Sequence, residues 1–258
     1  MKNNGLQNEK DIIELLNGRT LNDLPDFWQR RMKQLDRNFP LDEKIECFKC
    51  VHNHKADIGI RVKSYRYNIS IKSGYFVSVH MERISSFAGF LKSLGLDDEL
   101  INVLKYYHYG DGTLDGTGKV HYNLETIKTQ IKDKIEEFNK RVNEFEILKH
   151  IILRFLCTGT PYQRSYVTHI YAGTADYGEM LDAKTIIGYI LSGYSISTDS
   201  IHFGPFIYTP GYRGLTNFDE ENVKRYYINI KWPSINRDIR DAKDWLFNVK
   251  NKTENNLD

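Results

Sequence analysis

Four residues in the first third of the chain have the types and spacing that metal-assisted cleavage of a phosphodiester bond requires. They are Asp57, Ser70, Lys72 and Glu82. Mg²⁺ prefers hard oxygen ligands, and proteins hold it through one or two carboxylates while waters and substrate phosphates complete its shell. A nearby lysine ammonium orients the attacking water or stabilises charge on the phosphate, and the ion generates the nucleophile. The sequence therefore favours a Mg²⁺ site formed by Asp57, Glu82 and the backbone carbonyl of Ile71.

Two short segments must position these side chains. Residues 57–62 and 68–72 each alternate apolar and polar residues with a period of two, which predicts two strands. The connection over residues 63–67 is short and suits antiparallel neighbours. Because successive side chains of a strand point to opposite faces, Asp57 and Lys72 share the face that the isoleucines do not use. The hairpin then brings carboxylate and ammonium to one edge of the sheet, with the carbonyl that precedes Lys72 between them.

This arrangement resembles the PD-(D/E)xK nucleases, to which many type II restriction endonucleases belong. Their motif is an Asp at the start of one strand and a (Glu/Asp)-x-Lys on the next strand of a β-hairpin. Asp57 and Lys72 match it, whereas Ala56 replaces the proline and Ser70 replaces the usual acid. A subgroup of restriction enzymes is similar to this chain because it has Ser-x-Lys on the strand and its acid on the following helix. Glu82 would supply that acid.

The resemblance covers roughly residues 8–95 and implies a role for each site residue. Asp57 and Glu82 would bind Mg²⁺ with the Ile71 carbonyl, and Lys72 would activate water. Many members also carry a glutamate on the first helix that supports the site. The candidates here are Glu9 and Glu14.

The elements expected around the hairpin predict an α/β (α+β) fold. Helices are expected over residues 8–17, after Pro25, over 82–94, from about 123 to 155 and from Ser234 onward. Strands are expected over residues 57–62, 68–72, 166–171, 196–206 and 226–232. The Gly/Asp-rich segment 109–118 is expected to be a mobile loop.

By resemblance, this fold would be a restriction-endonuclease-like core with a central mixed sheet flanked by helices and a β-rich C-terminal half. A single domain would cover residues 1–250, with the catalytic core at roughly 8–160 and the half that reads DNA at roughly 161–250. The polar residues 251–258 would form a disordered tail.

Basic and aromatic residues interleave in the C-terminal half, and such side chains position phosphates and read base edges. Double-stranded DNA is therefore the expected partner. Symmetric duplex sites are cut most simply by symmetric dimers, which predicts a homodimer. No small-molecule cofactor is expected beside Mg²⁺. The residues expected to contact DNA are Ser73, Arg83, Tyr162, Arg164, Arg213, Lys224 and Arg225.

The bulk composition is that of an ordinary globular protein. The 258 residues are 40% hydrophobic and 27% charged, and the net charge of +2 means that any basic surface must be local. The most apolar segment, residues 147–156, is too short and too charged to cross a bilayer, so no membrane is expected. With three cysteines and no apolar signal segment, a cytoplasmic location is expected.

Two cysteines and two histidines, Cys47, Cys50, His52 and His54, resemble half of a zinc site. Structural zinc sites usually pair two ligand couples that lie a dozen or more residues apart, and here the histidines crowd Cys50. Zinc is therefore not the expected metal. A zinc-stabilised interaction protein nevertheless stays open as one alternative.

Two other readings of the hairpin also stay open. Asp, Ser and Lys occur together on any solvated sheet edge, and Glu82 is favoured by the helix dipole if it begins a helix. Because Ser70 departs from the motif, the chain is alternatively a catalytically inactive DNA-binding or defence-complex protein with a nuclease-derived fold.

Overall fold

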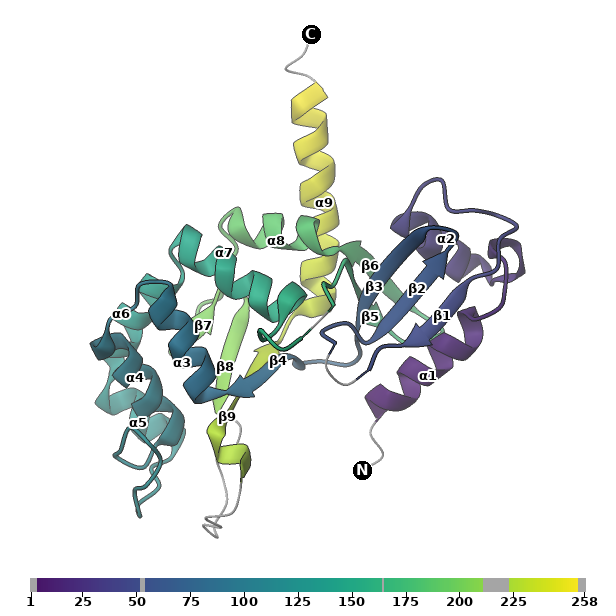
Figure 1. Cartoon of the computed structure of the whole chain (residues 1–258). Helices are drawn as coiled ribbons and strands as arrows, with labels where there is room; N and C mark the ends of the chain where they lie inside the picture. The colour runs from purple at the N-terminus through teal and green to yellow at the C-terminus, as the bar shows by residue number, and fades with distance from the viewer. Residues whose placement is uncertain (1–3, 52–53, 164, 211–222, 255–258) are drawn as a thin grey trace. The chain divides into compact units, whose positions relative to one another are not determined.

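The computed structural model describes residues 4–51, 54–163, 165–210 and 223–254, and within these ranges the chain has a mixed α/β fold (Figure 1). The expected α/β (α+β) class is thereby confirmed. Contacts divide the chain into two compact units. The first unit comprises Met1–Val77, Leu153–Gly193 and Ser234–Asp258, and the second comprises Ser78–Ile152 and Tyr194–Pro233. Each unit is thus discontinuous in sequence.

The first unit is built on a five-stranded sheet with the order β1-β2-β3-β5-β6. Its strands are β1 (Glu46–Lys49), β2 (Ile58–Val62), β3 (Tyr65–Lys72), β5 (His169–Gly173) and β6 (Gly178–Asp182). β3 and β5 run parallel and the other neighbours run antiparallel, so the sheet is mixed as expected. The predicted hairpin is the β2–β3 pair, with Ile58 opposite Ile69 and Val62 opposite Tyr65.

The isoleucines of this hairpin form the core of the first unit. Its α-helices are α1 (Asn4–Leu16), α2 (Asp26–Leu35), α8 (Ala183–Leu191) and α9 (Ile235–Glu254). A short 3₁₀ helix, η1 (Leu21–Asp23), and a π-helix, η2 (Arg154–Thr158), accompany them. Ile58, Ile69 and Ile71 are buried in one cluster with Trp28 and Met32 of α2. The alternate residues of β2 and β3 therefore lie on the opposite face of the sheet.

The C-terminal helix differs from the expectation. α9 continues to Glu254, so part of the predicted tail is helical, and residues 255–258 lie outside the described ranges. None of the helices in the described ranges is both long and apolar enough to cross a membrane.

The second unit holds a four-stranded sheet with the order β4-β9-β8-β7. Its strands are β4 (Val77–Arg83), β7 (His202–Phe203), β8 (Phe206–Pro210) and β9 (Tyr227–Trp232). Its helices are α3 (Ile84–Ser93), α4 (Asp98–Tyr109), α5 (Leu124–Gln130), α6 (Lys132–Val142) and α7 (Phe145–Leu153), and a short turn, η3, covers Val223–Tyr226. The expected strand over 226–232 is confirmed, whereas the one expected over 196–206 is reduced to β7.

The long helix predicted from about residue 123 is wrong, because three helices replace it. Ile131 adopts φ −125° and ψ 31°, which lies outside the helical region and separates α5 from α6. Asn143 ends α6, and its side chain donates to the carbonyl of Asn139. The continuous apolar seam therefore belongs to consecutive helices rather than to one.

The Gly/Asp-rich segment is organised around a buried carboxylate, which the expectation of a mobile loop had not foreseen. The Asp111 side chain has no exposed surface and pairs with Arg225 at 3.4 Å. Asp111 also accepts hydrogen bonds from the backbone and hydroxyl of Thr113 (2.9 and 2.7 Å) and from the amide of Gly118 (3.0 Å). The loop is thus tied to the turn that precedes β9.

We predict that Asp111→Ala lowers the free energy of unfolding by about 3–5 kcal/mol, because it leaves a buried guanidinium without its carboxylate. Asp115→Ala is the matched control in the same loop, since Asp115 is exposed and its carboxylate accepts from the amide and hydroxyl of Thr117. Urea unfolding of both variants measures the difference. Equal losses in the two variants would contradict the assignment of Asp111 as the anchor of the loop.

Candidate active site

Asp57 lies directly before β2, and its backbone is fixed on both sides. Its amide donates to the carbonyl of Ile69 at 2.9 Å, and its carbonyl accepts from the amide of Cys50 at 3.0 Å. Asp57 therefore continues the register of the hairpin although it precedes the strand. Its carboxylate points to the face of the sheet opposite the isoleucine core.

Three donors from the end of β3 converge on one oxygen of that carboxylate. Oδ2 of Asp57 accepts hydrogen bonds from the amide of Ile71 (2.6 Å), the hydroxyl of Ser70 (3.0 Å) and the ammonium of Lys72 (3.2 Å). Lys72 Nζ also donates to the Ile71 carbonyl at 3.1 Å. We call Asp57, Ser70, Ile71 and Lys72 the hairpin cluster.

The hairpin cluster is accessible but well supported. The side chains of Lys72 and Asp57 are 16% and 26% exposed, and Ser70 is buried. Hydrogen bonds to an ionised carboxylate are stronger than neutral ones, so these contacts hold Asp57 in one orientation. The expected meeting of the Asp57 carboxylate and the Lys72 ammonium is therefore observed, with the Ile71 carbonyl beside them. The catalytic roles of these residues stay predictions.

The donor chemistry of the cluster fits Mg²⁺ better than zinc. It offers one carboxylate and one backbone carbonyl, both hard oxygen donors, and Mg²⁺ takes its remaining ligands from water and substrate phosphate. In the described part of the chain, no group of three or more His, Cys, Asp or Glu side chains is placed to hold a metal ion. Within the hairpin cluster, Asp57 and the Ile71 carbonyl are the groups that would hold Mg²⁺.

Glu82 was expected to be that acid at the start of a helix, and this placement is wrong. Glu82 lies within β4, which continues to Arg83, and α3 begins at Ile84. Its buried carboxylate contacts His80 Nε2 at 2.8 Å and accepts a hydrogen bond from the Ser86 hydroxyl at 2.7 Å. Glu82 and both of these partners belong to the second unit, whereas the hairpin cluster belongs to the first unit.

The two candidate glutamates of α1 have other surroundings. Glu9 forms an ion pair with Lys49 of β1 at 3.1 Å, and Glu14 is exposed. The polar residue of α1 that reaches the sheet is Asn8, which is buried and donates to the carbonyl of Gly173 at 2.9 Å. Sequence reasoning missed Asn8, although it precedes the buried Ile12 by one helical turn.

The predicted DNA-contacting residues of the first unit lie outside the hairpin cluster. Ser73 follows β3 directly and is half-buried, and Tyr162 is 86% exposed. Arg164 lies outside the described residues. Of these residues, Ser73 is next to Lys72 in the sequence.

The predicted DNA-contacting residues of the second unit differ in their exposure and in their contacts within the protein. Arg83 ends β4 with its guanidinium 5.8 Å from the Tyr227 ring centroid, and Lys224 is exposed. Arg225 is only 11% exposed and is bound to Asp111, so it serves the fold of the loop. Arg213 lies outside the described residues.

The cysteines have the properties of structural thiols. Cys47, Cys50 and Cys157 are buried and unpaired with one another. Burial raises the pKa of the Cys47 thiol to about 12 and that of the Cys157 thiol to about 11. His52 lies outside the described residues. In the chain without a bound metal, these thiols are therefore neutral near pH 7.

We predict that the thiols of Cys47 and Cys157 resist alkylation by iodoacetamide at pH 7.5 in the native chain and react after unfolding. The reason is that the thiolate is the reactive form, and burial suppresses it. Mass spectrometry of labelled peptides measures both states. Rapid labelling of the native protein, or about one zinc ion per purified chain, would contradict this description.

The chemistry of this site rests on the hairpin itself. No protein-family model and no curated protein matches the sequence. The likeness to PD-(D/E)xK nucleases therefore depends on the residue types and geometry of Asp57, Ser70 and Lys72.

Proposed function

We propose that this chain is a Mg²⁺-dependent, sequence-specific double-strand DNA endonuclease of restriction type that hydrolyses phosphodiester bonds. The observation that carries the proposal is the position of the Lys72 ammonium, 3.2 Å from the Asp57 carboxylate and 3.1 Å from the Ile71 carbonyl. A cation and two hard oxygen donors thus meet at one edge of a rigid sheet. The proposal includes a homodimer, because symmetric duplex sites suit symmetric proteins.

Each member of the hairpin cluster has a defined part in this proposal. Asp57 and the Ile71 carbonyl would hold Mg²⁺, which when bound supplies positive charge and lowers the pKa of a coordinated water. Lys72 would orient the attacking water and stabilise charge on the phosphate. Ser70 donates to Asp57 and keeps its carboxylate aimed at this position. Because the groups stand on paired strands, their geometry is held more closely than loops would hold it.

A second candidate function is an inactive, nuclease-derived DNA-binding or defence-complex protein. The contacts of Glu82 favour it, since both of its carboxylate oxygens already have partners, in His80 and Ser86. With Ser70 in place of an acid, the cluster then keeps a single carboxylate. In that case Asp57 has a structural role, in which it closes the end of the hairpin through the Ile71 amide.

Incubation of the purified chain with phage DNA separates the two functions. The endonuclease proposal expects discrete fragments with Mg²⁺ and intact DNA with EDTA. DNA that is bound but stays intact at every Mg²⁺ concentration would support the inactive alternative. The fragment ends would also define the recognition sequence.

We predict that Lys72→Ala lowers the cleavage rate about 100-fold or more, the range for loss of a residue that acts on proton transfer. Its affinity for DNA and its free energy of unfolding should change little, because Lys72 Nζ bonds to the Asp57 carboxylate and the Ile71 carbonyl on the face opposite the isoleucine core. Lys33→Ala on the exposed surface of α2 is the control for loss of one positive charge. Full activity of Lys72→Ala would remove this residue from the mechanism.

We predict that Glu82→Gln leaves Mg²⁺-dependent cleavage unchanged and lowers the free energy of unfolding, because both carboxylate oxygens of Glu82 have partners within the second unit. Ser86→Ala is the matched control, since it removes one of these partners and leaves the carboxylate in place. Cleavage assays and urea unfolding of both variants measure the two effects. Loss of cleavage by a folded Glu82→Gln variant would contradict this prediction and make Glu82 the second acid.

A further inference from the structure

Two arginines stand opposite one another on the hairpin, at the end away from Lys72. Arg61 of β2 pairs in register with Arg66 of β3. Both guanidinium carbons lie 5.6 Å from the centroid of the same ring, that of Phe48 on β1. We call Arg61 and Arg66 the arginine pair, and Phe48 supplies the ring that both of them contact.

Strand parity places this group on the same face as the hairpin cluster. Arg61 alternates with the buried Ile60 and Val62, and so lies opposite the isoleucine core. Phe48 is registered with Gly59, where a Cβ atom would come within 2.5 Å of the ring. Glycine at this position therefore allows the ring to lie against the strand and beneath the guanidiniums.

The Glu46 carboxylate neutralises only part of the positive charge of the arginine pair. Like charges directly opposite on adjacent strands destabilise a sheet. Glu46 pairs with Arg61 at 2.8 Å, and both side chains are about half exposed, so this ion pair is weak. Arg66 donates from Nε to Asn68 at 3.2 Å, and its terminal nitrogens have no acceptor within the described residues. A planar pair of donors thus remains available for an anion.

The polar residues of β3 connect the arginine pair to the hairpin cluster. Arg66, Asn68, Ser70 and Lys72 alternate along one face of the strand. At about 3.3 Å per residue, Arg66 and Lys72 are roughly 20 Å apart along β3. A single phosphate group cannot contact both ends of this row. A chain of phosphates, as in a nucleic-acid backbone, can do so.

We propose that Arg61 and Arg66 bind phosphates of the DNA strand at a distance of several nucleotides from the bond held at the hairpin cluster. Guanidinium groups match phosphate oxygens in a two-point geometry that lysine lacks. The Phe48 ring holds both guanidiniums from the protein side and leaves their outer edges to the ligand. The identity of the ligand as the DNA substrate rests on the proposed function, whereas the phosphate chemistry rests on the arginine pair itself.

The test measures DNA binding in EDTA, so that cleavage plays no part. A fluorescein-labelled duplex is titrated with the full chain at several salt concentrations. Each lost phosphate contact lowers the salt dependence of log K by about 0.9, so Arg61→Gln combined with Arg66→Gln should lower it by about 1.8. Arg66→Lys should keep the slope while weakening binding, because the charge stays and the two-point geometry is lost.

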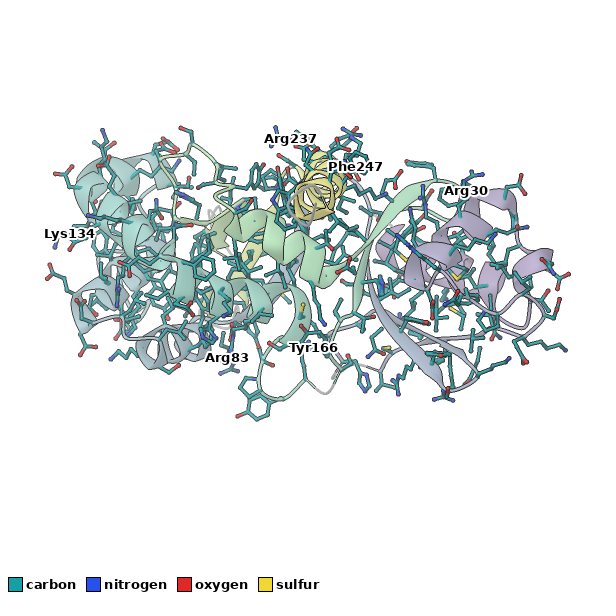
Figure 2. All side chains as sticks on the ribbon, turned by 90° about the horizontal axis from the view of Figure 1, so that it is seen from above. Arg30, Arg83, Lys134, Tyr166, Arg237 and Phe247 are labelled. Carbon is teal, nitrogen blue, oxygen red and sulfur yellow. The ribbon has the colours of Figure 1, made fainter. Side chains whose placement is uncertain are left out.

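The matched control removes the same charge from α2, which packs on the opposite face of the sheet, and from the segment that follows α2. Arg30→Gln combined with Arg37→Gln serves, because both arginines are exposed, and Arg30 extends from α2 in Figure 2. Equal slopes for the control and the Arg61/Arg66 variant would overturn the inference, as would a wild-type chain that binds no DNA. A reduced slope in a chain that cuts no DNA would support the inference and reject the proposed endonuclease.

Discussion

The convergence of three donors on Asp57 Oδ2 is the interaction on which the candidate site depends. The donors come from three consecutive residues of β3, and one of them, the Ile71 amide, belongs to the backbone. They meet Asp57 only because the β2–β3 register sets Ile69 beside it. A slip of one residue would turn Ser70 and Lys72 toward the core and the isoleucines toward solvent. The buried isoleucine face therefore fixes the polar face, and through it the geometry of the site.

The same register determines what lies at the other end of the hairpin. It sets Arg61 opposite Arg66 and seats Phe48 against Gly59. One face of the first unit thus carries an acid–ammonium pair at one end and two guanidiniums at the other. In the proposed endonuclease, such a face would combine the bond-cleaving end with a positively charged surface that positions the backbone.

Local sequence patterns predicted those parts of the molecule that local forces determine. The alternation in residues 57–62 and 68–72 predicted both strands and the meeting of Asp57 and Lys72, because side-chain direction follows directly from a period of two. Other features depend on partners distant in sequence. The parallel pairing of β3 with β5 joins residues about a hundred positions apart, and the continuation of β4 through Glu82 accompanies its membership of the second sheet. Local patterns therefore could not predict the surroundings of Glu82. They also could not predict that Asn8, rather than a glutamate of α1, bonds to the sheet.

Direct measurement of metal binding tests whether Asp57 forms a metal site or a structural cap. Mn²⁺ substitutes for Mg²⁺ at oxygen sites and can be followed by electron paramagnetic resonance in the presence of duplex DNA. The account predicts saturable Mn²⁺ binding by the wild-type chain, competed by Mg²⁺, and its loss in a folded Asp57→Asn variant. Equal Mn²⁺ binding by both proteins, or none by the wild type, would contradict it.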